Sequence, residues 1–276
     1  MRTYKALPGL VLACILAASA AQPANGSIMY GINRIGSSAG ELVTVDTLTG
    51  SATSVGPTGF QQIIGLAINS QGTLYGVDVF TDQLVTINRF TGAATAIGAT
   101  GFTDITGLAF DSNDVLFAVD PVVDRLLTVN TLTGAASSVG FLGSPHLNGL
   151  AFDSNGTLYG ADVVSDMLVT INTTTGAASN VGLFGFSEVT GLEFGSDGTL
   201  FATDTATDQL LAINKASGAG TSIGALGFGN VVSLALHPVP EPGTAIIFGS
   251  LIVCGGLARL RRRTMRVTAT TAVAST

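Results

Sequence analysis

Pairs of aspartates recur along this chain, with four residues from the first member of each pair to the second. Carboxylate oxygens are preferred ligands of Ca²⁺, so a ring of such pairs is a candidate calcium site. Aspartates at strand ends also accept hydrogen bonds from the backbone N–H groups of the following turn. The pairs are Asp78 and Asp82, Asp120 and Asp124, Asp162 and Asp166, and Asp204 and Asp208. Four identical copies favour the turn interpretation, and we predict no metal or cofactor, with calcium as the alternative.

A second set of polar residues has the same spacing but changes in type from copy to copy. A phenylalanine lies two residues before four of the five members, and Ser144 breaks this series. Polar groups beside aromatic rings suit a sugar or a peptide. The alternative is solvated loop polarity, with the phenylalanines packed beneath it. The predicted ligand-binding residues are Gln62, Asp104, His146, Glu188 and Asn230, together with Phe60, Phe102, Phe186 and Phe228.

These residues belong to an internal repeat of 42 residues. The segment Leu74–Asp78 recurs at Leu116–Asp120, Leu158–Asp162 and Leu200–Asp204, and a first copy begins at Met29. A turn glycine recurs at the same interval, as Gly50, Gly92, Gly134, Gly176 and Gly218. A fixed period in this range is the signature of a repeat architecture.

Each repeat contains four short strands joined by Asn-, Asp- and Gly-rich turns. In one copy the expected strands are Ile105–Phe110, Val115–Asp120, Leu126–Asn130 and Ala135–Gly140. Four strands in about 42 residues match one blade of a β-propeller. Composition agrees, because 11% charged residues and 36 glycines exclude a helical bundle and favour a turn-rich β protein.

The start and end of the repeat array predict how the ring closes. The chain enters at a second strand, Met29–Asn33, and leaves after a lone first strand, Val231–His237. Pairing these segments completes a blade in a 3+1 arrangement and removes two open sheet edges. We therefore predict an all-β fold, a five-bladed β-propeller of four-stranded blades over residues 28–238. The strand order resembles that of NHL- and YVTN-type propellers.

Within this fold one residue departs from its repeat. Glu193 stands where the innermost strands of the other copies have Ala67, Ala109, Ala151 and Ala235. Two interpretations stay open: Glu193 points into the water of the channel, or it is a partner of His146.

Charge excludes one class of partner. Residues 22–238 contain 17 Asp and Glu against four Arg and Lys. This acidic field repels phosphate backbones, so we do not expect nucleic acid to bind.

The N-terminus has the features of a secretory signal peptide over residues 1–21. Basic Arg2 and Lys5 precede an apolar run, Leu10–Ala18, and the small residues Ala18-Ser19-Ala20 then offer a cleavage site. We expect the Sec translocon to export the chain.

The C-terminus combines three ordered features over residues 239–263. Val239-Pro240-Glu241-Pro242 precedes a short apolar helix expected at residues 244–260, followed by Arg261, Arg262 and Arg263; a polar tail occupies 264–276. The helix would hold the chain in the membrane, with the arginines on the cytoplasmic side. These features resemble a PEP-CTERM sorting domain. The resemblance implies processing by an exosortase and release to the cell surface or exopolysaccharide matrix. The thirteen-residue tail departs from that pattern, and an ordinary membrane tail is the alternative.

The sequence therefore predicts an exported, non-catalytic propeller that contacts glycans or other surface proteins. It is anchored in the inner membrane until it is processed. The alternative is a metal-dependent hydrolase, lactonase or lyase with its site at the mouth of the channel.

Overall fold

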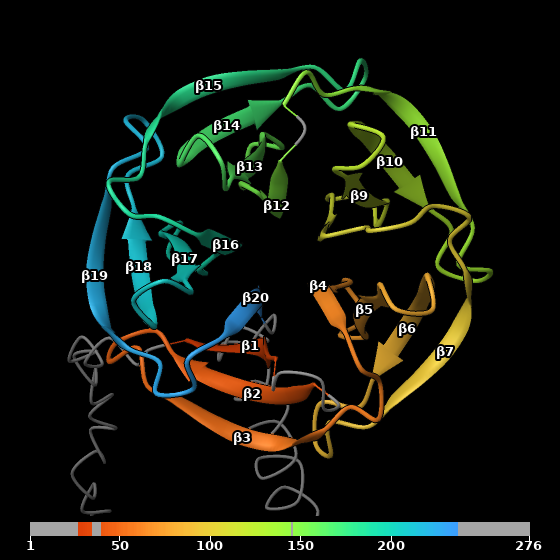
Figure 1. Ribbon diagram of the computed structural model, residues 1–276, viewed down its shortest axis with the longest axis horizontal. Coiled ribbons are helices and arrows are strands. Elements are labelled where there is room, and N and C mark those ends of the chain that lie inside the picture. The colour runs from red at the N-terminus through yellow and green to blue at the C-terminus, as the bar shows by residue number, and fades with distance from the viewer. Residues whose placement is uncertain (1–26, 35–39, 145, 237–276) are drawn as a thin grey trace, which may run out of the picture.

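The computed structural model describes residues 27–34, 40–144 and 146–236. They form five four-stranded antiparallel sheets arranged around a central axis, with one strand of each sheet near the axis and another at the rim (Figure 1). The predicted five-bladed propeller is confirmed. Two sets of predictions lie outside the described residues: the signal peptide at residues 1–21, and the sorting motif, helix and tail at residues 239–276. The last two residues of the predicted propeller, 237–238, also lie outside them. In the described part, no helix is long and apolar enough to cross a membrane.

We number the blades in ring order, each from its innermost strand outward. Blade 1 contains β20 (Val231–Leu236), β1 (Ile28–Asn33), β2 (Glu41–Asp46) and β3 (Ala52–Pro57). Blade 2 contains β4 (Ile63–Ile68), β5 (Leu74–Asp78), β6 (Gln83–Ile87) and β7 (Ala94–Ala99). Blade 3 contains β8 (Gly107–Phe110), β9 (Leu116–Asp120), β10 (Arg125–Val129) and β11 (Ala136–Phe141). Blade 4 contains β12 (Leu147–Phe152), β13 (Leu158–Asp162), β14 (Met167–Ile171) and β15 (Ala178–Leu183). Blade 5 contains β16 (Val189–Phe194), β17 (Leu200–Asp204), β18 (Gln209–Ile213) and β19 (Gly220–Ala225).

The ring closes as the repeat phase predicts. Strand β20 pairs antiparallel with β1, with Met29 opposite Leu236, and this gives blade 1 its 3+1 composition. The junction between blades 5 and 1 uses the same contacts as the others. A Cβ at Gly50 would lie 2.6 Å from the carbonyl oxygen of Gly224, and the Ala52 N–H donates to the Leu226 carbonyl at 3.0 Å. Closure therefore continues the repeated blade-to-blade packing.

The innermost strands pack closely because glycines face the neighbouring backbone. A Cβ at Gly149 would lie 2.6 Å from the carbonyl oxygen of Thr190 in the next blade, a separation that real Cβ atoms do not show. The absence of a side chain at this level therefore allows neighbouring blades to approach closely. At the fifth equivalent position, Ser233 carries a buried hydroxyl with no hydrogen-bond partner in the described structure.

The two ends of the channel differ in what they carry. We call the end where the innermost strands begin the amino face and the end where they finish the carboxyl face. Because Met29 is paired with Leu236, the described chain enters and leaves the propeller side by side on the carboxyl face.

Candidate functional site

The repeated aspartates stabilise the turns on the amino face. Asp78 accepts the Gln62 N–H at 3.0 Å and the Thr81 hydroxyl at 2.7 Å. Asp162 accepts backbone N–H groups of its own turn and the Ser144 hydroxyl at 2.6 Å. The second members of the pairs have φ between 53° and 56°, a conformation that aspartate tolerates better than most residues. In the described part of the chain, no group of three or more His, Cys, Asp or Glu could hold a metal ion.

Asp120 has one carboxylate oxygen without a donor. Its Oδ1 accepts the Val122 and Val123 N–H groups, whereas Oδ2 is buried with no partner in the described structure. Burial raises the pKa of Asp120; the two N–H bonds oppose the change, and the negative charges of Asp104 and Asp82 add to it. Asp78 and Asp204 receive a hydroxyl from the threonine three residues later, where blade 3 has Val123.

The five predicted polar residues lie on the amino face, one per blade, just before the innermost strands. Asp104, His146 and Glu188 are exposed, and Gln62 and Asn230 are half-buried. Their main chains are in use: the His146 carbonyl accepts the Val163 N–H, and the equivalent carbonyls of Gln62, Glu188 and Asn230 also accept N–H groups. No hydrogen bond is formed between any two of the five. Ligand binding by this set stays a prediction.

The phenylalanines beside them belong largely to the core. Phe60, Phe102, Phe186 and Phe228 are half-buried, and each packs against a hydrophobic cluster between blades. This is the packing that the alternative interpretation describes. Phe186 also lines a shallow recess with Asp166 and Leu183 at the outer part of the amino face.

Other apolar side chains of the amino face point into solvent. Phe80, Val122 and Val164 occupy the same turn position in three consecutive blades and are 65%, 63% and 65% exposed. Phe141 and Leu183, at the ends of outer strands in blades 3 and 4, are also exposed. We call Phe80, Val122 and Val164 the apolar arc. Sequence reasoning missed the apolar arc, although its three positions are equivalent in the repeat.

A cavity of about 280 Å³ opens at the other end of the channel, on the carboxyl face. None of the nine predicted ligand-binding residues lines it. Small alanine side chains at one level of the wall leave this space open, and phenylalanine side chains lie beside them. The lining residues are Ala67, Ile68, Asn69, Ser70, Ala109, Phe110, Asp111, Ser112, Asp114, Ala151, Phe152, Glu193 and Leu236.

Glu193 is the lining residue that breaks the alanine series. Its Oε1 accepts the Phe194 N–H at 2.8 Å, and its Oε2 accepts the Leu236 N–H at 3.2 Å. Burial raises the pKa of Glu193 from 4.5 to about 7, and these two bonds oppose the rise only in part. His146 lies at the opposite end of β12, about five residues or ~16 Å of strand from the level of Glu193. The interpretation that Glu193 points into the channel is therefore supported, and the interpretation that it is a partner of His146 is wrong.

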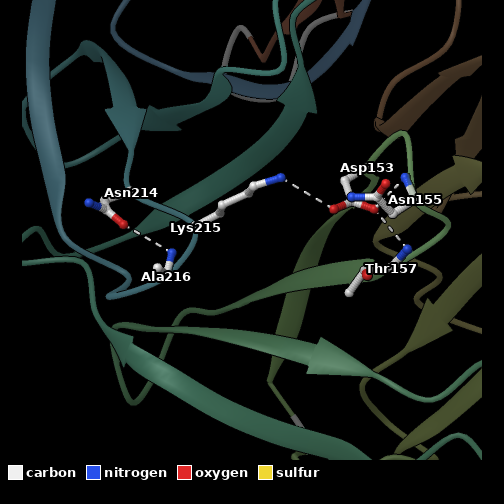
Figure 2. Close-up of polar contacts among 6 residues, drawn as sticks. All are labelled: Asp153, Asn155, Thr157, Asn214, Lys215 and Ala216. Atoms are coloured by element: carbon white, nitrogen blue, oxygen red, sulfur yellow. Dashed lines mark hydrogen bonds and ion pairs between the residues drawn. The ribbon is translucent and has the colours of Figure 1, made fainter.

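A salt bridge joins blades 4 and 5 on the carboxyl face. Lys215, in the β18–β19 turn, places Nζ 3.3 Å from Asp153 Oδ2, and Asp153 also accepts the N–H groups of Asn155 and Thr157 (Figure 2). Burial alone would raise the pKa of Asp153, but these hydrogen bonds and the lysine charge leave it lowered. Nζ also lies 5.7 Å from the ring centre of Phe194, the neighbour of Glu193.

Comparison with known proteins identifies the architecture alone. No protein-family model and no curated protein matches the sequence. Among solved structures 596 chains match, so this fold is too widely shared to indicate an activity. A symmetrical protein described as emerging de novo is 21% identical, with a TM-score of 0.53 over 78% of this chain and 100% of that one. A chain of the nidogen/laminin complex is 15% identical, with a TM-score of 0.55 over 77% and 86%. A streptogramin B lyase is 11% identical, with a TM-score of 0.48 over 76% and 88%.

Proposed function

We propose that this protein is an exported, non-catalytic β-propeller whose amino face binds glycans or proteins at the cell surface or in an exopolysaccharide matrix. The observation that carries the proposal is the exposed apolar arc of Phe80, Val122 and Val164 beside the varied polar residues. Large apolar side chains exposed to water on one face favour contact with a partner. The repeated carboxylates, by contrast, are largely occupied in stabilising their own turns.

The path of the chain supports display of this face. The segments that carry the predicted export and sorting signals attach on the carboxyl face, where Met29 pairs with Leu236. A propeller held from that face directs its amino face away from the membrane. Sec and an exosortase are the partners in transit, and matrix polysaccharide or a surface protein is the final partner.

A binding assay with a matched control tests the amino face. We expect the full-length protein to bind a component of the matrix, or a glycan on an array, without turning it over. Replacing Phe80, Val122 and Val164 by serine should weaken binding at least tenfold, whereas Phe90→Ser, at a residue 80% exposed on the carboxyl face, should not. Equal loss in both variants would refute the assignment. Metal-dependent turnover abolished by His146→Ala would instead support the hydrolase, lactonase or lyase alternative.

Sorting is tested separately. Replacing Pro240, Glu241 and Pro242 by alanine should leave the protein in the membrane fraction, because an exosortase would no longer recognise the motif. Unchanged release in this variant would show that the terminal segment is not a PEP-CTERM signal. The binding assay above does not depend on this result.

A further inference from the structure

The cavity on the carboxyl face has the composition of a small-molecule site. Its volume, about 280 Å³, is close to the lower end of the roughly 300–1,000 Å³ typical of such sites. Phe110 and Phe152 supply aromatic walls, and each ring is held by a neighbouring aromatic ring, that of Tyr75 at 5.4 Å and that of Phe117 at 5.5 Å. The walls are therefore fixed before any ligand enters.

Glu193 supplies a carboxylate to the inner wall of this cavity, among other polar lining residues. A carboxylate has about four acceptor positions, and the backbone N–H groups of Phe194 and Leu236 use two of them. Alanine occupies the equivalent position in the other four blades, so the fold does not need a carboxylate there. Burying a charge without a counter-charge is unfavourable, and this cost is relieved when a cation binds beside it.

Among the described residues, the charged groups around Glu193 leave it without a cationic partner. Asp111 and Asp114 lie across the cavity; hydrogen bonds from Ser70 and Gln71 lower the pKa of Asp114, which keeps it ionised. The ammonium group of Lys215 is bonded to Asp153 and lies over the ring of Phe194. Strands β4, β8, β12 and β20 contribute no charged side chain, and none of the described residues that line the cavity is basic.

We propose that this cavity binds a small organic amine, with the ammonium group on the Glu193 carboxylate and the apolar body between Phe110 and Phe152. A bare metal ion would leave the apolar walls unused, and a neutral ligand would leave the carboxylate without its counter-charge. This site is independent of the amino face, so it stands whether or not that face binds a glycan or a protein.

Calorimetry with benzylamine and benzyl alcohol on the full-length protein tests the proposal, because the two probes differ by the cationic group. At pH 8 benzylamine should bind one to one and at least tenfold more tightly than benzyl alcohol, since hydrogen bonds to charged groups are the stronger class. Glu193→Gln should remove this preference, and Glu41→Gln, at the start of β2 on the amino face, should keep it. Ser112→Arg, at the exposed rim of the cavity, should weaken benzylamine binding by supplying a competing cation.

The pH dependence gives a second readout. Because the carboxylate must be ionised to hold the amine, benzylamine should bind about tenfold more weakly at pH 6 than at pH 8. Circular dichroism would show that each variant is folded. The proposal is overturned if benzylamine gives no binding, if both probes bind equally to the natural protein, or if Glu193→Gln binds benzylamine as tightly as that protein does.

Discussion

Replacing Glu193 by glutamine should make the propeller more stable at pH 8. It should also reduce the change in the free energy of unfolding between pH 4.5 and 7. Burial in the channel wall raises the pKa of this carboxyl from 4.5 to about 7. The folded state therefore binds a proton more tightly than the unfolded state, so the free energy of unfolding falls as the pH rises through this interval. Below pH 4.5 both states are protonated and the penalty is absent.

The magnitude follows from the pKa change and the two hydrogen bonds. At about 1.4 kcal/mol for each pKa unit, ionisation of Glu193 costs the folded state up to about 3 kcal/mol above pH 7. Glutamine removes this cost but leaves one of the two N–H groups, of Phe194 or Leu236, with a poorer acceptor, a loss of about 1 kcal/mol. The expected net gain is about 2 kcal/mol at pH 8, changing to a small loss near pH 4.

Guanidinium unfolding followed by far-UV circular dichroism is the appropriate assay, since the chain has no tryptophan. The free energy of unfolding should be measured for both proteins from pH 4 to 8, because other titrating groups cancel in the difference. Glu188→Gln, at an exposed residue on the amino face, is the matched control for the loss of one carboxylate. Parallel pH profiles for Glu193→Gln and the natural protein would refute the reasoning.

Two further substitutions test the repeated frame. Gly176→Ala should destabilise the propeller by more than about 3 kcal/mol or prevent folding, because its Cβ would lie 2.6 Å from a carbonyl carbon of the preceding blade. Gly143→Ala, at a glycine with a similar positive φ but open space around the added Cβ, should cost about 1 kcal/mol. Equal melting temperatures for the two variants would contradict the packing argument. Val123→Thr should stabilise the protein by about 1 kcal/mol at pH 7 and lower the pKa of Asp120, because it supplies the missing hydroxyl donor, whereas Val122→Thr should do neither. Chemical unfolding measures the stability, and NMR titration measures the pKa of the carboxyl. An unchanged pKa of Asp120 in Val123→Thr would contradict this account.

The sequence was sufficient for the architecture because a repeat defines many equivalent contacts at once. The expected strand Val115–Asp120 is observed as Leu116–Asp120, and Ile105–Phe110 as Gly107–Phe110. The closing strand could be predicted because the chain begins with a blade that lacks its first strand and ends with a first strand that lacks a blade. Pairing the two removes both open sheet edges. The terminal segments lie outside the described residues, and their predicted roles stay predictions.

The position of the cavity could not be predicted in the same way. Repeat spacing shows that Ala67, Ala109 and Ala151 are equivalent, but the space that they leave depends on the radius of the channel at their level. The glycine level closes tightly, while the alanine level two residues further along remains open. Spacing also fails to show contact: His146 and Glu188 are equivalent residues of neighbouring blades, yet no hydrogen bond joins them.

Departures from the repeat separate into two kinds once the contacts are known. Ser144 interrupts the phenylalanine series, but its hydroxyl donates to Asp162, so this change has a local structural role. Val123 leaves the Oδ2 atom of Asp120 buried in a packed turn, where a change within the chain itself is the direct remedy. Glu193 alone of these places a costly carboxylate beside open space, and the remedy there is a donor from outside the chain. The same electrostatic cost therefore indicates a stabilising mutation at one position and a ligand at the other.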